Sequence, residues 1–196
     1  MFTGIITAVA EIEKAELKHG SLFLNLTQPR GWKIKSGQSI ATDGVCLTVK
    51  KVSTNSYQTE LMAETLAKST FGQVLPAKVN LEQSLRLKDL LGGHLLLGHV
   101  DAVGVIEKIK SQGQAKLYQI SFPKKFRPFV VEKGAIAVDG ISLTIVGVGK
   151  NWFTVSAVDY TLQHTTMSGK RKGEFVNLEF DIIAKYLSKI ISQRYG

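Results

Sequence analysis

Apolar and polar side chains alternate over short stretches of the chain, which is the pattern of strands that are half-buried in a sheet. Leucine stands at every second position of the segment 22–26. Other short runs are rich in β-branched and aromatic residues and are separated by Gly, Asn, Ser or Pro, which favour turns. We expect strands at 22–26, 47–49, 57–62, 79–82, 100–109, 117–122, 136–138, 143–148, 153–158 and 175–180, with short helical turns at 64–70 and 161–166.

The pattern occurs twice. The matching blocks, which are offset by 96 or 97 residues, are DGVCLTV (43–49) with DGISLTI (139–145), ETLAKST (64–70) with YTLQHTT (160–166), and VNLE (79–82) with VNLE (176–179). Blocks in the same order at a nearly constant offset indicate two tandem copies of one domain. Short strands in a unit of this size favour a small closed barrel, because closure removes exposed sheet edges. We therefore predict an all-β protein with domains at 1–95 and 96–181.

The tail, residues 182–196, follows a different pattern. Ile183, Leu187 and Ile190 are spaced by four and then three residues, and the basic side chains lie off this stripe. The spacing predicts an amphipathic helix outside both repeats. This helix either packs back onto the second barrel or mediates oligomerisation, because two heptad turns are too few to define a coiled coil.

The composition is that of a globular protein that acts inside the cell. Hydrophobic residues make up 44% and charged residues 21%, which excludes a disordered chain. No run approaches the ~18 apolar residues of a membrane span, and the N-terminal residues lack the cationic start of a signal peptide. The single cysteine, Cys46, excludes an internal disulfide and a cysteine-rich zinc module. We expect a cytoplasmic protein without membrane contact.

The net charge of +9 raises the question of an anionic partner such as nucleic acid. Only residues 170–172 form a run of three basic side chains, and glycines flank that run as in a loop. The aromatic residues do not interleave with the basic ones, as they would on a surface that stacks bases. We therefore predict a solvated basic surface and no nucleic-acid partner.

The duplicated Asp-Gly block is the first candidate for chemistry. Asp-Gly is a hairpin-turn signal in its own right. The two copies differ at one informative position, which is Cys46 in the first and Ser142 in the second. Two similar cavities would then present a thiol and a hydroxyl, an arrangement that suits two similar ligands held differently. The alternative is that Cys46 is a small buried hydrophobic residue.

The glycine-rich segment 92–101 carries two histidines, His94 and His99, and is the second candidate. Their spacing is not that of a helical zinc-binding pair, and no cysteine cluster accompanies them. They either cap the connection between the copies or serve as general acids and bases. The sequence has no phosphate-binding glycine loop, Gly-x-Ser-x-Gly elbow or Rossmann fingerprint.

Taken together and in order, the N-terminal MFTGI, both Asp-Gly blocks and the histidine segment resemble the riboflavin synthase family over nearly the whole chain. The resemblance implies two six-stranded Greek-key β-barrels and a C-terminal helix that builds a homotrimer. It implies an active site between the N-barrel of one subunit and the C-barrel of its neighbour. The reaction implied is a dismutation, in which two molecules of 6,7-dimethyl-8-ribityllumazine give riboflavin and 5-amino-6-(D-ribitylamino)uracil by transfer of a four-carbon unit. No metal or cofactor is expected, and an assembly with lumazine synthase is left open.

The resemblance also implies roles for individual residues. Cys46 and His99 would act around C7 of the lumazine in the N-barrel, Ser142 and Asp139 on the facing ligand, and Ser39 in proton transfer, while Phe2 is a candidate cover. The residues expected to bind substrate are Gly4, Ile5, Ile6, Leu47, Thr48, Glu60, Leu61, Met62, Ala63, Glu64, Thr65, Gly98, Val100, Lys133, Leu143, Thr144, Val158, Asp159, Tyr160, Thr161, Leu162 and Gln163.

Two points qualify the resemblance. Asp159 and Tyr160 stand where family members usually have Pro followed by Glu or His, which affects the expected ribityl contacts at Tyr160. A non-catalytic lumazine or flavin antenna protein would share the fold. The presence of Cys46, His99 and Ser142 favours the enzyme.

Overall fold

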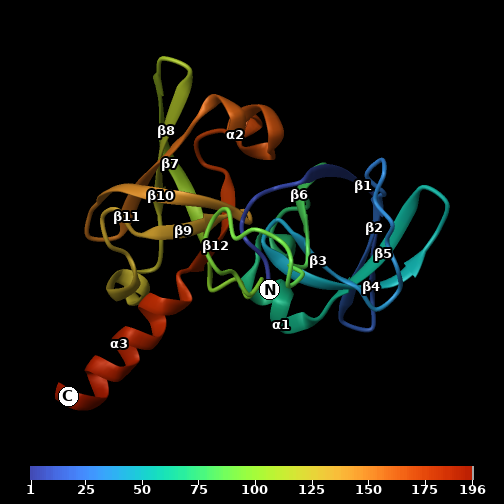
Figure 1. The fold of residues 1–196 in the computed structure, drawn as a ribbon, viewed down its shortest axis with the longest axis horizontal. Coiled ribbons are helices and arrows are strands. Elements are labelled where there is room, and N and C mark those ends of the chain that lie inside the picture. Colours follow the sequence, from blue (N-terminus) through green and yellow to red (C-terminus); the bar gives the residue numbers. More distant parts are fainter. Residues whose placement is uncertain (196) are drawn as a thin grey trace.

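A computed structural model describes residues 1–195, so Gly196, the last residue of the predicted tail, lies outside the described residues. The chain forms two closed antiparallel barrels of six strands each, followed by one long helix (Figure 1). The predicted all-β, two-barrel fold is therefore confirmed.

The first barrel has the strand order β1-β2-β5-β4-β3-β6, in which each neighbouring pair is antiparallel. Its strands are β1 Ala8–Lys18, β2 Ser21–Thr27, β3 Ser39–Thr42, β4 Val45–Val52, β5 Ser56–Leu61 and β6 Lys78–Gln83. Between β5 and β6 the chain forms the helix α1 Ala63–Lys68 and the 3-10 helix η1 Thr70–Gly72.

The second barrel has the strand order β10-β11-β8-β7-β12-β9. Its strands are β7 Ala102–Gln112, β8 Ala115–Ser121, β9 Ala135–Val138, β10 Ile141–Val148, β11 Trp152–Ala157 and β12 Phe175–Phe180. Its helices are the 3-10 helix η2 Lys124–Phe129, the helix α2 Asp159–His164 and the 3-10 helix η3 Thr166–Gly169.

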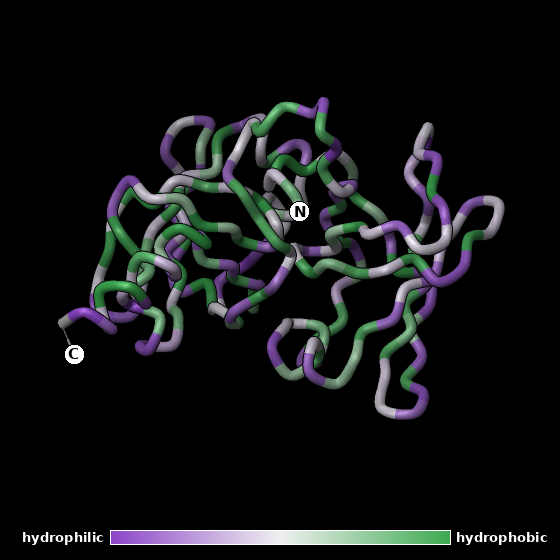
Figure 2. Tube along the Cα trace, turned by 60° about the horizontal axis from the view of Figure 1, so that its bottom comes forward, coloured by the Kyte–Doolittle hydropathy of each residue, from purple (hydrophilic) through white to green (hydrophobic). Residues whose placement is uncertain are grey.

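The barrels keep separate hydrophobic cores. Leu24, Ile40 and Leu81 are fully buried in the first, and Ile106 and Phe153 in the second. Hydrophobic and hydrophilic stretches interleave along both lobes of the chain, as barrels with a packed inside and a solvated outside require (Figure 2).

The two Asp-Gly turns face each other where the barrels meet. Asp43-Gly44 joins β3 to β4 and Asp139-Gly140 joins β9 to β10, and all four residues have positive φ, between 44° and 79°. This is the two-residue hairpin geometry that Asp-Gly favours. A Cβ on Gly44 would lie 2.8 Å from the Gly140 nitrogen, and one on Gly140 would lie 2.7 Å from the Gly44 nitrogen. The backbones of the two turns are thus in direct contact, and no larger residue fits.

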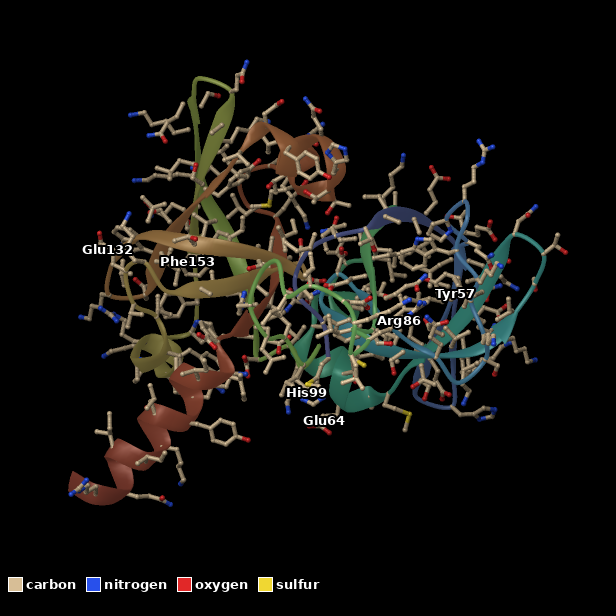
Figure 3. All side chains as sticks on the ribbon, in the orientation of Figure 1. Tyr57, Glu64, Arg86, His99, Glu132 and Phe153 are labelled. Carbon is tan, nitrogen blue, oxygen red and sulfur yellow. The ribbon has the colours of Figure 1, made fainter. Side chains whose placement is uncertain are left out.

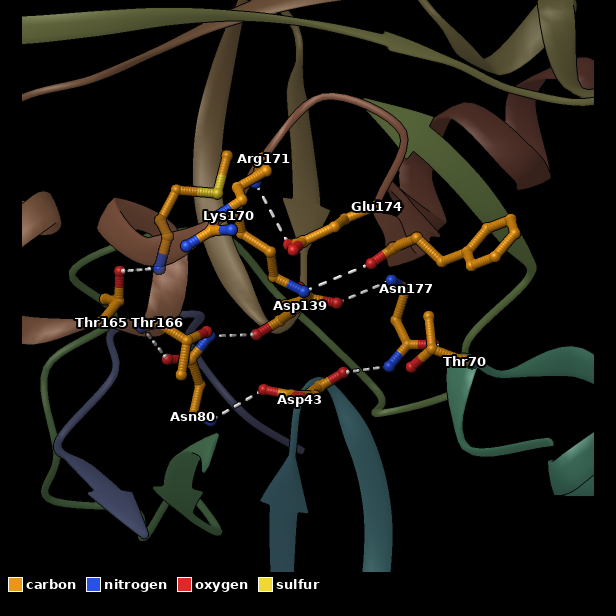
Figure 4. A network of polar contacts seen from close by, with 12 residues as sticks. Asp43, Thr70, Asn80, Asp139, Thr165, Thr166, Lys170, Arg171, Glu174 and Asn177 are labelled. Carbon is orange, nitrogen blue, oxygen red and sulfur yellow. Dashed lines mark hydrogen bonds and ion pairs between the residues drawn. The ribbon is translucent and has the colours of Figure 1, made fainter. Parts of the chain in front are cut away.

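Two buried asparagines join the barrels around these turns (Figure 4). The Asn80 amide donates to the Asp139 carbonyl at 3.0 Å, and the Asn177 amide donates to the Asp43 carbonyl at 2.9 Å. The asparagine at the equivalent position of each VNLE block therefore crosses to the other copy. The interface between the barrels has an approximate twofold symmetry that follows the sequence duplication.

One ion pair breaks this symmetry. The Lys170 ammonium lies 2.7 Å from an Asp139 carboxylate oxygen, and both side chains are largely buried. Burial lowers the pKa of Lys170, but the neighbouring Asp139 and Asp43 carboxylates outweigh it and raise that pKa overall. Burial, together with the negative charge of Asp139, raises the pKa of Asp43 well above its usual range.

The long helix α3 Ile182–Tyr195 extends away from the barrels (Figure 1). The side chains of its predicted apolar stripe, Ile183, Leu187 and Ile190, are between 54% and 61% exposed. The helix contacts η2 of the second barrel, but the single chain leaves most of this stripe uncovered. No helix among residues 1–195 is both long enough and apolar enough to cross a membrane.

Candidate active site

A cavity of about 480 Å³ on the first barrel gathers six of the predicted site residues. Its lining comprises Val45, Cys46, Glu64, Thr65, Lys68, Gly98, His99 and Val100. Cys46 comes from β4, Glu64 and Thr65 come from α1, and Gly98 to Val100 come from the segment before β7. Figure 3 shows His99 and Glu64 on the same side of the molecule.

Strand alternation decides which side chains of β4 reach this outer surface. Cys46 and Thr48 point outward, whereas Leu47 and Val49, which alternate with them along the strand, are buried in the core. Ser39 pairs with Thr48 across β3 and β4, so its side chain lies on the same face as Thr48. The structure therefore places the predicted residues Ser39, Cys46 and Thr48 along one wall.

The segment that carries His99 belongs by sequence to the second copy but lies on the first barrel. The Cys46 N–H donates to the Gly98 carbonyl at 2.9 Å. The N–H groups of Leu97 and Gly98 donate to the Glu179 carboxylate of the second barrel at 2.7 and 3.0 Å. His99 is thus held beside Cys46 by contacts from both barrels.

The N-terminal segment makes the reciprocal crossing. The Ser142 N–H of β10 donates to the Gly4 carbonyl at 2.8 Å. The N–H groups of Thr3 and Gly4 donate to Glu82 of the first barrel at 2.6 and 2.9 Å. Ser142 therefore makes the same backbone contact with a crossing chain segment in the second barrel that Cys46 makes in the first.

Ser142 also contacts His94, for which the sequence left open a capping role or a role as general acid or base. His94 Nδ1 and Ser142 Oγ are 2.7 Å apart, and burial lowers the pKa of His94. His94 Nε2 is buried and has no hydrogen-bond partner in the described structure. The pair can pass a proton between imidazole and hydroxyl. The only sequence signal for it was the histidine itself, because His94 has no counterpart in the first copy.

Asp139 lies elsewhere. It is 1% exposed, its Oδ1 accepts the Asn177 N–H at 2.7 Å, and its other oxygen faces Lys170. The structure thus places it in the polar interface between the barrels, whereas Ser142 lies on the outer wall of β10. Its assignment to the chemistry stays a prediction.

Four leucines that were expected to bind substrate are buried in the hydrophobic cores of the barrels. These are Leu47, Leu61, Leu143 and Leu162. Each of these leucines is next to a residue that points outward. A ligand on the outer wall could therefore contact only the leucine's backbone. Phe2, the candidate cover, is 1% exposed, forms a β-bridge with Leu96 and packs in a small cluster with Ala41 and Ala137.

Two of the remaining predicted contacts lie at equivalent places in the two copies. Met62 and Val158, which precede α1 and α2, are 61% and 56% exposed. Tyr160 is also exposed and stacks on His164, with ring centroids 4.1 Å apart. Ile5 lines a second cavity of about 520 Å³ together with Thr3.

Three of the other predicted residues form polar contacts: Glu60 pairs with Lys50, Asp159 accepts a hydrogen bond from Gln163, and the Thr161 carbonyl accepts one from Thr165. Ala63 begins α1, and Lys133 precedes β9 with a positive φ. Ile6 packs against the second core, and Thr144 is exposed on β10. Among the described residues, no group of three or more His, Cys, Asp or Glu could hold a metal ion.

The lumazine-binding domain model matches this chain twice, at residues 3–84 and 97–181. Riboflavin synthase from Mycobacterium tuberculosis is 39% identical over 97% of this chain and 98% of its own length. Riboflavin synthase from Photobacterium phosphoreum is 38% identical over 97% of this chain and 89% of its own. The corresponding enzyme from Actinobacillus pleuropneumoniae is 34% identical over 99% and 91%.

Solved structures share the fold. LumP complexed with riboflavin superposes with a TM-score of 0.85 at 22% identity and covers 92% of this chain. LumP complexed with 6,7-dimethyl-8-(1'-D-ribityl) lumazine gives 0.83 at 21% identity. The duplicated family match and the full-length similarity to curated enzymes agree with the duplicated barrels and their paired outer walls, and the chain belongs to the riboflavin synthase family of lumazine-binding proteins.

Proposed function

We propose that this protein is a riboflavin synthase, which converts two molecules of 6,7-dimethyl-8-ribityllumazine into riboflavin and 5-amino-6-(D-ribitylamino)uracil. The observation that carries the proposal is the cavity in which Cys46, Glu64, Thr65 and His99 meet, within a chain that matches curated riboflavin synthases over its full length. The two products together contain all the atoms of the two substrates, so the reaction needs no external oxidant or reductant.

The duplicated barrels suit a reaction between two identical molecules. Each barrel would hold one lumazine against its outer wall, β4 with Cys46 in one and β10 with Ser142 in the other. One lumazine loses a proton from its C7 methyl group and becomes a carbon nucleophile. The other is activated by addition at C7, and the resulting pentacyclic adduct fragments. Holding the two rings in contact supplies a large part of the rate enhancement.

Side chains around the cavity would move the protons. His99 is the candidate general acid or base beside Cys46, and the Ser142–His94 pair is the equivalent on the facing ligand. Glu64 and Thr65 at the start of α1 can accept and donate hydrogen bonds to ring edges or ribityl hydroxyls.

We also propose that the complete site forms between subunits of a homotrimer. The support is the apolar stripe of α3, which the single chain leaves exposed. In that assembly the first-barrel wall of one subunit would face the second-barrel wall of its neighbour. A symmetric trimer would then hold three equivalent sites.

The test is to incubate the purified protein with 6,7-dimethyl-8-ribityllumazine, without metal or nucleotide, and to quantify the products by chromatography. We expect one riboflavin and one pyrimidine for every two lumazines consumed. Tight binding of the lumazine without turnover would instead identify a non-catalytic lumazine-binding antenna protein of the same fold.

A further inference from the structure

Two buried glutamates occupy equivalent positions in the two copies, and neither lines the Cys46 cavity. Glu82 ends the first VNLE block and is 5% exposed, and Glu179 ends the second and is 3% exposed. Burial raises the pKa of each carboxyl above its ordinary value. The Thr3 hydroxyl and two backbone N–H groups oppose that shift at Glu82, and backbone N–H groups and the Lys185 charge oppose it at Glu179. Burying a carboxylate is costly, so its hydrogen-bond partners indicate why it is there.

The two carboxylate oxygens of each glutamate accept the backbone N–H groups of two consecutive residues. Glu179 Oε1 accepts the Leu97 N–H at 2.7 Å, and its Oε2 accepts the Gly98 N–H at 3.0 Å. Glu82 Oε1 accepts the Thr3 N–H at 2.6 Å, and its Oε2 accepts the Gly4 N–H at 2.9 Å. We call residues 3–4 and 97–98 the crossing segments, since each joins the wall of the barrel opposite its glutamate.

The crossing segments end at the residues proposed for the chemistry. The Gly98 carbonyl accepts the Cys46 N–H, and the next residue, His99, lines the Cys46 cavity. The Gly4 carbonyl accepts the Ser142 N–H at 2.8 Å. Each carboxylate is therefore linked to a site wall through the two peptide N–H groups that it holds.

We propose that Glu179 is a positioning residue for His99 and Cys46, and that Glu82 is the equivalent positioning residue for Ser142. The inference rests on the proposed function and deepens it: each barrel orients part of the active site carried by the other. A carboxylate that accepts two charge-assisted bonds fixes both the position and the orientation of a short segment. Such support matters because small misplacements of reacting groups are costly in rate.

The test uses Glu179→Gln, with Glu82→Gln as its symmetry-related partner and Glu13→Gln, an exposed side chain on β1, as the control. Glutamine keeps the shape but turns one acceptor into a donor that faces a backbone N–H. Cys46 is the chain's single cysteine, so its reaction with a neutral thiol reagent reports on the Gly98 segment without any substrate.

We expect Glu179→Gln to accelerate Cys46 modification by roughly tenfold, the effect of one lost charge-assisted hydrogen bond. Glu82→Gln should leave that rate at the wild-type value, because its crossing segment contacts Ser142. Both variants should lower kcat by about tenfold or more with a smaller change in KM, and Glu13→Gln should match wild type.

A folded Glu179→Gln variant with wild-type Cys46 reactivity would overturn the proposal, as would equal acceleration in both glutamine variants. If Glu179→Gln does not fold, amide exchange in the wild-type protein decides: protected Leu97 and Gly98 amides support the proposal and freely exchanging ones overturn it. If the wild-type protein converts no lumazine, the proposed function fails, while the Cys46 rates still test the role of Glu179.

Discussion

At the scale of single residues, duplication has produced pairs with the same sequence context and different surroundings. Asp43 and Asp139 occupy equivalent hairpin turns, and each accepts the N–H of the asparagine in its own VNLE block. Only Asp139 has a cation, Lys170, against its second oxygen. The environment of a buried carboxylate, more than its position in the motif, therefore sets what it contributes.

Because only Asp139 of the two pairs with Lys170, we expect replacement by asparagine to affect stability differently at Asp139 and at Asp43. Asp139→Asn leaves the buried Lys170 without its ion-pair partner and should lower the free energy of unfolding by about 3–5 kcal/mol. Asp43→Asn keeps the acceptor for the Asn80 N–H and removes a like charge, so it should change stability by less than about 1 kcal/mol, or raise it. Urea unfolding measures both, and equal losses would contradict the assignment of the ion pair.

The raised pKa of Asp43 also predicts a pH dependence of stability. Its folded pKa lies above the ordinary value of 3.8, so as the pH rises from that value the unfolded chain releases its proton first. The free energy of unfolding should therefore fall as the pH rises from the ordinary to the raised pKa of Asp43. The Asp43→Asn variant should lack this pH-dependent loss. The measurement is the unfolding free energy of both proteins across this pH range. A difference between them that does not change with pH would argue against a raised pKa.

At the scale of elements, the sequence was most informative where a pattern is local. The Asp-Gly hairpins, the helices near 64–70 and 161–166, and most strands were predicted from turn residues and alternation. β1 and β3 were missed. β1 is largely exposed and has a bulge between Ile12 and Lys14. β3 reads Ser-Ile-Ala-Thr, with one strongly apolar residue, whereas its equivalent β9, which was predicted, reads Ala-Ile-Ala-Val. The crossing segments, and the Ser142–His94 contact beside one of them, could not be predicted, because they depend on contacts between residues far apart in sequence.

Replacing Gly98 by alanine tests how closely a crossing segment packs on β4. The φ of Gly98 is +75°, and an added Cβ would lie 2.5 Å from the Cys46 Cβ, so Gly98→Ala should cost about 1–3 kcal/mol and reduce turnover. Gly113→Ala is the matched control, since its φ is also positive but nothing lies within 4 Å. It should keep full turnover and lose only about 1–2 kcal/mol of stability to backbone strain. Equal activities of the two variants would show that the Gly98 contact does not shape the site.

At the scale of the whole molecule, each barrel carries one wall of the proposed site and also supports the other barrel's wall. The two-barrel architecture followed from the duplication in the sequence. The cavity residues Cys46, Glu64, Thr65, Gly98 and His99 were also anticipated, through the family resemblance. The exposed stripe of α3 shows that the single chain leaves apolar surface without a partner.

Replacing Leu187 on α3 by aspartate tests the proposed homotrimer. Leu187 is 54% exposed in the single chain, so Leu187→Asp should leave both barrels folded but should separate the trimer into monomers and abolish turnover. Lys189→Ala, an exposed change on the same helix, should remain trimeric and active. Analytical ultracentrifugation with circular dichroism distinguishes these outcomes, and a trimeric Leu187→Asp protein would exclude the helix as the contact.

The most direct test of the whole account mixes two inactive variants. His99→Ala disables the first-barrel wall and Ser142→Ala the second-barrel wall, so each homotrimer should turn over lumazine very slowly. In mixed trimers that are co-expressed in equal amounts, about a quarter of the inter-subunit sites would combine two intact walls by random assembly. We expect riboflavin formation to recover to about a quarter of the wild-type rate under these conditions. Mixed trimers that stay as inactive as their parents would contradict an active site shared between duplicated barrels of neighbouring subunits.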